Sequence, residues 1–382
     1  MAEIKNLKKT AKRILRAVKN KEKIILYGDA DLDGVSSVII LKETIKTLGG
    51  AIFAIYFPDR EVEGYGISET ALNFLKNESP ALLIAIDCGI TNFKEVKLAK
   101  KLGFEVIVID HHEILDKLPE ADIIVDPKQK GDKYPFKGFA SVGLAFKLVE
   151  LLLKDKMSEN FRKALLELTA LATIADTMPR ESENMVFIEE GLVSLENSWR
   201  PGIKGFLETE PFKSYSNLNQ KVSKIISILN IRDVKARLPA SFRVLTASSS
   251  EVAKEIIEEL LAKAQIRKET IEVITSEVEK RISQKSEPII FEGDPSFELI
   301  LISSVASIIC QRYQKPTFLY KKMAEQSQGT VRTPTGLDSV ALMKKCKKYP
   351  LTFGGHPQAS GFRIKNEYLE DFKNCLIKNL NL

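Results

Sequence analysis

The stretch Ile24-Ile-Leu-Tyr-Gly28, continued by Asp29-Ala-Asp-Leu-Asp-Gly34, decides the fold of this 382-residue chain. Its first part is a short apolar run with the length of a buried strand, and three aspartates follow at alternate positions. In open α/β sheets, ligands bind beyond the carboxyl ends of the strands. The aspartates therefore stand where such a sheet places a functional site.

Three further apolar runs of strand length also end in acidic residues. If all four runs are neighbouring parallel strands, their acids meet at one edge of one sheet. The chain has only three histidines, and two of them follow one of these runs. The runs and the residues behind them are Ala81–Ile86 with Asp87, Glu105–Ile109 with Asp110-His111-His112, and Ile123–Val125 with Asp126.

Helical patterns alternate with these strands, which predicts an α/β fold with a parallel sheet in an N-terminal domain. The long helix expected at Ser250–Lys285 has no Gly or Pro and connects this domain to a second, smaller α/β domain. The predicted domains are 1–249, with an N-terminal amphipathic helix and a helical extension, the connector 250–287, and 288–382. Expected strands are Lys23–Tyr27, Ala51–Tyr56, the three runs above, Pro288–Phe291, Glu298–Ile302 and Thr317–Tyr320. Expected helices are Ser36–Leu48, Ser68–Asn77, Asn92–Leu102, Ile114–Leu118 (weaker), Gly143–Lys154, Glu159–Ala175, Met185–Ser194, Val305–Tyr313, Gly336–Lys347 and Tyr368–Asn379.

Composition is that of an ordinary soluble protein, with 44% hydrophobic and 28% charged residues. The longest apolar runs are too short to span a bilayer, and the Lys-rich N-terminus has no secretory signal pattern. A net charge of +6, with basic residues crowded in the first 20 positions and from Arg312 to Lys348, is weak support for a polyanionic partner. The alternative is a solvated lysine-rich surface. Four cysteines without CxxC spacing predict reduced thiols and no zinc site; they are Cys88, Cys310, Cys346 and Cys375.

So many carboxylates at one edge repel one another unless cations neutralise them. Aspartates with one or two imidazoles and no thiolate favour Mn²⁺ or Mg²⁺. A pair of such ions about 3.5–4 Å apart clamps phosphoryl oxygens and generates a hydroxide nucleophile. The alternative is a set of ordinary turn aspartates. Asp29–Gly34 is also similar to an EF-hand loop, but position 40, where that loop needs Glu, is Ile40.

Together these motifs resemble the signature of the DHH phosphoesterase superfamily, on Gly28–Ser37, the Asp87 turn and Asp110–His112. Gly354-Gly-His-Pro-Gln-Ala-Ser-Gly361 resembles the motif of the associated DHHA1 domain. Within the superfamily the chain is most similar to the RecJ family of single-strand-specific 5′→3′ exonucleases, from about residue 23 to 365. That similarity rests on Pro58–Gly66, Val125–Lys128, Tyr134–Phe136, Ala172–Asp176 and Arg200–Gly202.

This resemblance assigns roles by position. Asp87 would bridge two ions, Asp110 would orient His111, and His112 would lie over the scissile phosphate. Tyr65 would stack a base, although core packing is the alternative for this ring. The implied metal ligands are Asp29, Asp31, Asp33, Asp87, His111 and Asp176, and the implied substrate contacts are Gly354, Gly355, His356, Arg332, Arg60 and Tyr65.

The resemblance implies Mn²⁺- or Mg²⁺-dependent hydrolysis of single-stranded DNA from the 5′ end, in repair or recombination. Two alternatives stay open: a phosphodiesterase for short oligoribonucleotides or cyclic dinucleotides, and a non-enzymatic scaffold. Expected partners are single-stranded nucleic acid and single-strand-binding or replication and repair proteins. A monomer in the cytoplasm, away from membranes, is expected. The expected departures from the family are the lack of room for an OB-fold after Leu382, an altered Asn-Ala-x-Gly-Arg element at Leu229–Arg237, a lost glycine-rich stretch at Leu301–Val305, and Asp126 in place of Asn.

Overall fold

The computed structural model describes residues 3–60, 62–114 and 117–380. The chain forms two compact units, and the boundary between them lies after Leu261. That boundary falls inside helix α11 (Ser250–Ile282), which matches the long helix expected from the sequence. The finer division at 249/250 and 287/288 stays a prediction.

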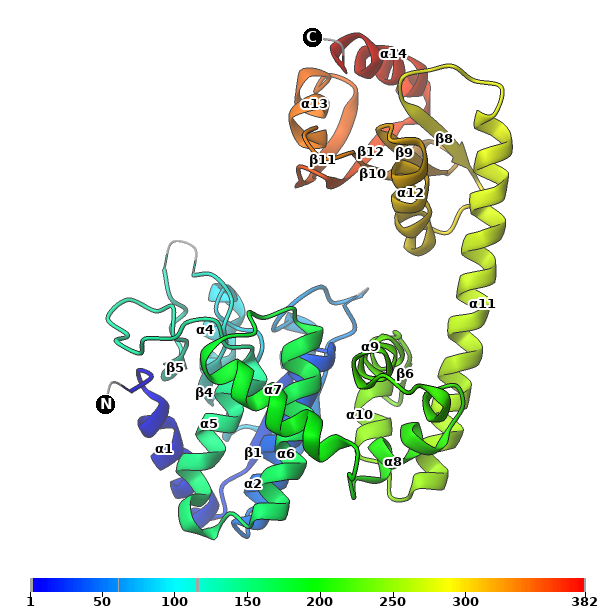
Figure 1. Cartoon of the computed structure of the whole chain (residues 1–382). Helices are drawn as coiled ribbons and strands as arrows, with labels where there is room; N and C mark the ends of the chain where they lie inside the picture. Colours follow the sequence, from blue (N-terminus) through cyan, green and yellow to red (C-terminus); the bar gives the residue numbers. More distant parts are fainter. Residues whose placement is uncertain (1–2, 61, 115–116, 381–382) are drawn as a thin grey trace. The chain divides into compact units, whose positions relative to one another are not determined.

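The first unit is built on a five-stranded parallel sheet with strand order β2-β1-β3-β4-β5 (Figure 1). Its register brings Gly28, Ile86, Ile109 and Val125 into one row across four strands. The residue after each of them is an aspartate, so the expected convergence at one edge is confirmed. All five predicted strands are present, as β1 (Ile24–Gly28), β2 (Ala54–Tyr56), β3 (Ala81–Ile86), β4 (Phe104–Ile109) and β5 (Ile123–Val125).

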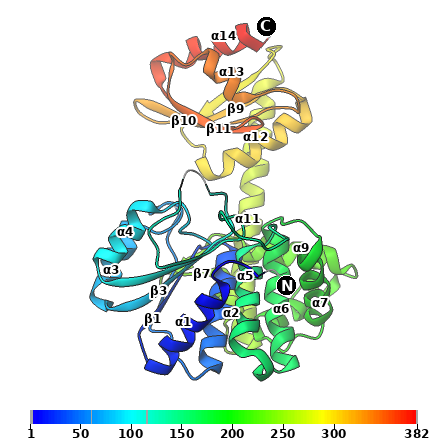
Figure 2. The same ribbon diagram turned by 90° about the vertical axis from the view of Figure 1, so that its left-hand side faces the viewer.

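Helices cover both faces of this sheet, as Figure 2 shows for α3 and α4 on one side and α1, α2, α5 and α6 on the other. The α3/α4 side closes a core around Tyr27, Leu83 and Val106. On the other side α2 packs against α5 and α6 and is buried along most of its length. The bounds are α1 (Leu7–Asn20), α2 (Leu32–Thr47), α3 (Glu69–Leu75), α4 (Phe93–Lys101), α5 (Ser141–Leu153) and α6 (Glu159–Ala175).

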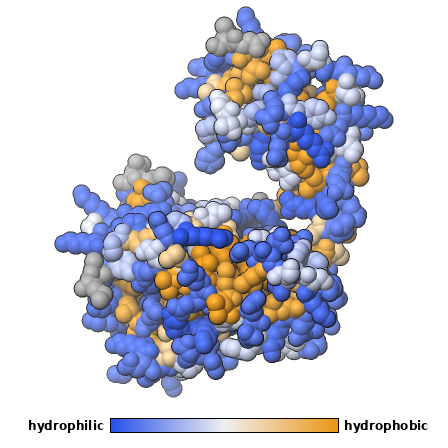
Figure 3. All heavy atoms as spheres, viewed as in Figure 1, coloured by the Kyte–Doolittle hydropathy of each residue, from blue (hydrophilic) through white to orange (hydrophobic). Residues whose placement is uncertain are grey.

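A helical extension follows α6 and completes the first unit. Hydrophobic surface gathers in Figure 3 over the region where α7 runs in Figure 1, in keeping with exposed Met185, Val186 and Val193 on that helix. Only α7 of these elements was expected. The extension consists of α7 (Ser182–Leu195), α8 (Pro201–Glu208), α9 (Leu218–Leu229), the strand pair β6 (Val234–Lys235) and β7 (Leu238–Pro239), and α10 (Ala240–Leu245).

The second unit contains another five-stranded sheet, in the order β11-β12-β10-β9-β8, with β8 and β9 parallel and the other pairs antiparallel. The strand expected at Glu298–Ile302 is wrong, because Leu299–Ile302 forms the first turn of α12. A short apolar run fits a buried strand and a buried helix turn equally well. The elements are β8 (Ile290–Asp294), α12 (Leu299–Tyr313), β9 (Thr317–Lys322), β10 (Gln326–Arg332), α13 (Ser339–Lys345), β11 (Pro350–His356), β12 (Ala359–Lys365) and α14 (Leu369–Leu380).

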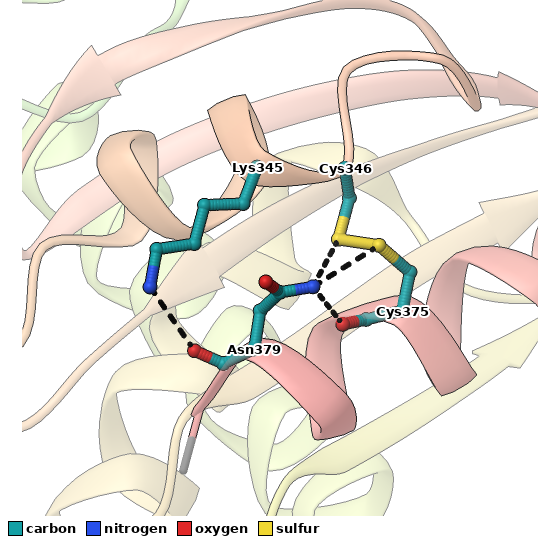
Figure 4. Close-up of a disulfide and its surroundings, with 4 residues drawn as sticks. All are labelled: Lys345, Cys346, Cys375 and Asn379. Carbon is teal, nitrogen blue, oxygen red and sulfur yellow. Dashed lines mark hydrogen bonds between the residues drawn. A yellow bond between two sulfur atoms is a disulfide. The ribbon is translucent and has the colours of Figure 1, made fainter. Parts of the chain in front are cut away.

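Cys346 and Cys375 form a disulfide in the second unit (Figure 4). The bond joins the end of α13 to α14, and the Asn379 amide donates to both sulfurs. The prediction of four reduced thiols is therefore wrong for this pair, which is 29 residues apart in sequence but brought together by packing of the two helices. Cys88 and Cys310 are free and buried.

The weak helix expected at Ile114–Leu118 includes residues 115 and 116, which lie outside the described residues, so it stays a prediction. Within the described ranges, no helix combines the length and the apolar character needed to cross a membrane.

Candidate metal centre

The order in which the chain adds strands to the first sheet reverses between β1 and β3. The chain leaves β1 for β2 on one side and returns to β3 on the other. Ligands of open α/β folds bind at such a switch point. Asp29 and Asp87 follow these two strands directly, and both are almost fully buried. The site therefore lies at the position that the topology favours.

The turn after β1 is shaped by its own side chains. Asp31 caps α2 by accepting from the amides of Asp33 and Gly34, each at 3.1 Å, so this helix starts earlier than expected. A Cβ on Gly34 would come within 2.4 Å of the Asp29 carbonyl oxygen, so the close approach of turn and helix requires glycine. The tight turn therefore keeps Asp29, Asp31 and Asp33 together at the carboxyl edge of the sheet.

Asp33 is held by the start of α5. Its two oxygens accept from the backbone amides of Ser141 at 2.7 Å and Val142 at 2.8 Å. The Ser141 hydroxyl also donates to Asp87 Oδ1 at 3.0 Å. This contribution of Ser141 was not predicted, because the expected helix begins at Gly143 and nothing local marks a helix N-terminus as a carboxylate-binding group.

Asp87 combines burial with an uncommon backbone conformation. Its φ of +62° lies in the left-handed region, which aspartate tolerates better than most residues. Burial first, and the nearby charges of Asp33 and Asp31 second, raise the pKa of Asp87 well above its usual range. Burial and the charges of Asp31 and Asp176 do the same to the pKa of Asp33. A cation bound among these carboxylates would offset both effects and favour their ionised forms.

His111 carries the clearest sign of a metal ligand. Both of its ring nitrogens are buried and neither has a hydrogen-bond partner within the part of the chain that the structure describes. Its Nε2 lies 3.3 Å from Asp87 Oδ1, 3.4 Å from Asp176 Oδ2 and 3.8 Å from Asp33 Oδ2. Burial, followed by the neighbouring His112, lowers the pKa of His111 to about 4. A neutral imidazole facing three carboxylates fits a divalent cation.

Asp176 and the other predicted ligands lie close to His111 or to Asp87. Asp176 caps the C-terminus of α6, and burial raises its pKa to about 6. Three overlapping groups have ligand atoms close enough to share an ion: Asp33 with His111 and Asp176, Asp87 with His111 and His112, and Asp29 with Asp31 and Asp87. The structure thus brings together all six predicted metal ligands, while their binding of ions stays a prediction.

Asp110 contacts a different histidine from the one expected. Its Oδ1 lies 2.7 Å from Nδ1 of His112, and its oxygens also accept from the amides of Ile90 and His111. The prediction that Asp110 orients the ring of His111 is wrong, because Nδ1 of that ring has no partner among the described residues. Burial alone would lower the pKa of His112, but the hydrogen bond and charge of Asp110 outweigh it and raise that pKa.

Arg60 and Tyr65 lie beside these groups. Arg60 donates to both oxygens of Asp29 and, at 2.8 Å, to Asp31 Oδ2. The Tyr65 hydroxyl donates to the Asp87 carbonyl at 3.0 Å and lies 3.0 Å from His112 Nδ1. Tyr65 is therefore a neighbour of the site rather than a core residue, and its ring is about half exposed.

The predicted substrate loop lies in the second unit. Arg332 pairs with Ala359 across β10 and β12, and Ala359 pairs with His356 on β11, so these three residues form one row. Gly355 has a φ of +134° and no room for a Cβ beside the Ala359 carbonyl, whereas a Cβ on Gly354 would meet nothing. Arg332 donates to the hydroxyl of Ser307 at 3.1 Å, and His356 is exposed. Their binding of substrate stays a prediction.

Known proteins match this chain in sequence and in fold. Residues 23–173 match the family model for the DHH family, N-terminal domain. The single-stranded-DNA-specific exonuclease RecJ of Bacillus subtilis is 32% identical over 98% of this chain, which spans 48% of that relative. This chain thus covers about half the length of that curated relative.

Solved structures agree with this match. A crystal structure of exonuclease RecJ bound to manganese is 25% identical, covers the whole of this chain and 96% of its own, and superposes with a TM-score of 0.79. RecJ from Thermus thermophilus in complex with Mn²⁺ is 23% identical, with a TM-score of 0.76 over 99% of this chain and 55% of its own. The expected two-part α/β architecture is confirmed. Residues 23–173 match the DHH family model, and the chain is similar to RecJ in sequence and fold over nearly its whole length.

Proposed function

We propose that the chain hydrolyses the phosphodiester bonds of single-stranded DNA from the 5′ end, with two Mn²⁺ or Mg²⁺ ions at the carboxyl edge of the first sheet. The observation that carries this proposal is His111, whose ring nitrogens have no hydrogen-bond partner among the described residues and whose Nε2 faces Asp33, Asp87 and Asp176. The similarity to exonuclease RecJ and to its manganese-bound crystal structure supports the choice of substrate and ion.

The proposed ligands fall into two overlapping sets that share Asp87. We assign Asp33, His111 and Asp176 to one set, which Asp87 joins through its 3.3 Å approach to His111, and Asp31 with Asp29 to the other, which Asp87 joins directly. Asp29 differs from the rest because both of its oxygens already accept from Arg60, so it would bind an ion only after giving up part of that pair. Divalent cations held here would acidify the attacking water and neutralise charge on the phosphate.

The protein's own groups supply the rest of the chemistry. Asp110 keeps His112 protonated over a wider pH range, so its ring can donate a proton to a phosphate oxygen or to the leaving group. Tyr65 holds the His112 ring through its hydroxyl. Arg60 presents a fixed guanidinium beside the site, which suits a phosphate oxygen of the strand. We propose that His356 and Arg332 also contact phosphates of the strand. We further propose that the protein acts on DNA in the cytoplasm.

The test is a comparison of substrates with one protein preparation. End-labelled single-stranded DNA, duplex DNA, short RNA and cyclic dinucleotides are incubated with the full chain and Mn²⁺ or Mg²⁺. We expect preference for long single-stranded DNA and release of nucleotides from its 5′ end. Turnover confined to short RNA or cyclic dinucleotides would instead support the small-substrate phosphodiesterase, and turnover of none would support the scaffold.

Asp110→Asn tests the role of His112. Removing the carboxylate charge lowers the pKa of His112, so the ring loses its proton at a lower pH. We therefore expect activity to decline at a lower pH than in the wild type. We expect kcat to fall about 10–100-fold, as for loss of other groups that orient a catalytic side chain. The measurement is kcat/KM between pH 6 and 9. Asp155→Asn removes the same charge outside the site and should keep the wild-type pH profile; an unshifted profile in Asp110→Asn would refute the role.

A further inference from the structure

Helix α1 presents a one-sided basic surface that the proposed active site does not use. Six of the 14 residues from Leu7 to Asn20 are Lys or Arg, and none is acidic. The apolar face, including Leu7, Ile14 and Ala17, is buried against the sheet unit, where α1 contacts α5 and β5. The basic residues of the opposite face are exposed. They are Lys8, Lys9, Lys12, Arg16 and Lys19, with Lys5 just before the helix.

The acids near this helix are already neutralised. Arg13 is buried and donates to both oxygens of Glu105 at 2.7 Å and to Glu22 at 2.6 Å. Asp122 accepts from Lys100 at 2.9 Å and from the amide of Val106 at 2.8 Å. These carboxylates therefore do not cancel the exposed cations of α1.

Most of those cations lack a counter-charge in direct contact. Lys8 pairs with Glu3, but both side chains are more than half exposed, so water and salt screen this pair. Among residues 3–60, 62–114 and 117–380, neither Lys12 nor Lys19 pairs with an acid. Lys9 contacts only a carbonyl, that of Asp122, at 3.4 Å, and Arg16 lies 3.9 Å from a Glu105 oxygen that Arg13 already binds. The surface keeps a net positive charge for an anionic ligand.

The cations form a line rather than a cluster. Lys8, Lys12 and Arg16 are spaced four residues apart, so each lies about 6 Å further along the helix than the last. At one end of the line, Lys5 and Asn6 bind the loop after β5 and the strand itself. At the other end, Arg13 binds Glu105 near the start of β4. The line thus runs from the carboxyl edge of the sheet, which carries the candidate metal centre, towards the amino edge.

A pocket of about 470 Å³ lies beside this line, at the amino edge. It is lined by Lys9, Lys12, Arg13, Arg16, Glu105, Asp122 and Ile123. A protein partner would need apolar anchors, and Leu15 is the one large apolar side chain of α1 that is markedly exposed. Repeated cations with little apolar surface suit a phosphate backbone instead.

We infer that α1 is a second nucleic-acid contact, which binds the backbone of a single strand through Lys8, Lys12, Arg16 and Lys19 at a distance from the metal centre. This inference rests on the proposed function, because it assigns a path to the same substrate. Its contacts are with phosphates and carry no sequence preference. A strand long enough to reach α1 gains affinity from it, whereas a very short oligonucleotide that fills only the catalytic site does not.

The experiment compares a double charge reversal, Lys12→Glu with Arg16→Glu, with the wild-type chain. Binding of a long labelled single strand is measured by fluorescence anisotropy in EDTA, over a range of salt concentrations, so that the strand stays intact. We expect roughly tenfold weaker binding and a salt-dependence slope reduced by about 1.4, or about 0.7 for each phosphate that the helix no longer neutralises. Mn²⁺-dependent hydrolysis of an oligonucleotide of about five nucleotides, near the lower limit of single-strand site sizes, should be unchanged.

The matched control makes the same charge change on the other face of the sheet. Lys97→Glu with Lys101→Glu alters two exposed lysines of α4 and should leave binding of the long strand within about twofold of the wild type, because both lysines lie off the path. Equal weakening in both double variants, or wild-type binding in the α1 variant, would overturn the inference. A wild-type chain that binds long strands without hydrolysing them would end the proposed function but leave the α1 comparison decisive; a chain that binds no single strand overturns both.

Discussion

Asp87→Ala should abolish Mn²⁺-dependent hydrolysis of single-stranded DNA while the chain stays folded. Asp87 is common to both proposed ion sites and approaches His111 to 3.3 Å. Its loss removes a ligand from each site, so we expect kcat to fall by more than the roughly 10²–10³-fold that losing one stabilising donor costs. The measurement is single-turnover hydrolysis of a 5′-labelled strand, together with Mn²⁺ binding by titration calorimetry.

Folding and activity are separated by controls. Asp155→Ala removes an exposed aspartate outside the site and should keep full activity. His111→Ala should match Asp87→Ala, and the double variant should be little worse than either, since residues that act as a unit are not additive. Two effects on stability oppose each other in metal-free Asp87→Ala, because the substitution removes a buried carboxyl whose pKa is raised but places alanine at a φ of +62°. The thermal midpoint should therefore stay close to that of the wild type. Retained turnover in either single variant would contradict the site.

The sequence predicted the first sheet well because each of its signals is local. Strands such as Ala81–Ile86 are continuous apolar runs between helices, and the aspartate after each strand shows where the sheet ends. The second unit was predicted less completely. β10 (Gln326–Arg332) is polar and only partly buried, so its sequence lacks the apolar run that marked the other strands. Its identity as a strand comes from pairing with β9 and β12.

The candidate site divides in the same way. The residue types and the edge where they meet could be predicted, because strand ends in a parallel sheet are level. The contacts could not, since they depend on side-chain directions and on elements distant in sequence. Asp110 hydrogen-bonds the ring of His112. The amide of Ser141 donates to Asp33, more than one hundred residues away in sequence, and Arg60 donates to Asp29. None of these contacts leaves a local pattern in the sequence.

Asp126→Asn should stabilise the metal-free chain at neutral and alkaline pH. Asp126 follows β5 in the same row as the metal-centre acids and is fully buried. Its Oδ1 accepts from the Lys128 amide at 2.7 Å, but its Oδ2 has no partner among the described residues. Burial raises its pKa from 3.8 to about 7. Asparagine keeps the acceptor and has no charge to bury.

The pH dependence follows from the sign of that shift. The unfolded carboxyl loses its proton near pH 3.8, whereas the folded one keeps it until about pH 7. The contribution of Asp126 to stability is therefore full below pH 3.8 and is lost progressively as the pH rises to 7, at about 1.4 kcal/mol per unit. Asp126→Asn should exceed the wild type by about 4 kcal/mol at pH 8, with the difference shrinking towards pH 4. The difference in free energy of unfolding is measured by urea unfolding in EDTA at both pH values, with Asp155→Asn as the exposed counterpart. A difference between Asp126→Asn and the wild type that does not change with pH would mean that the buried charge does not cause the stabilisation.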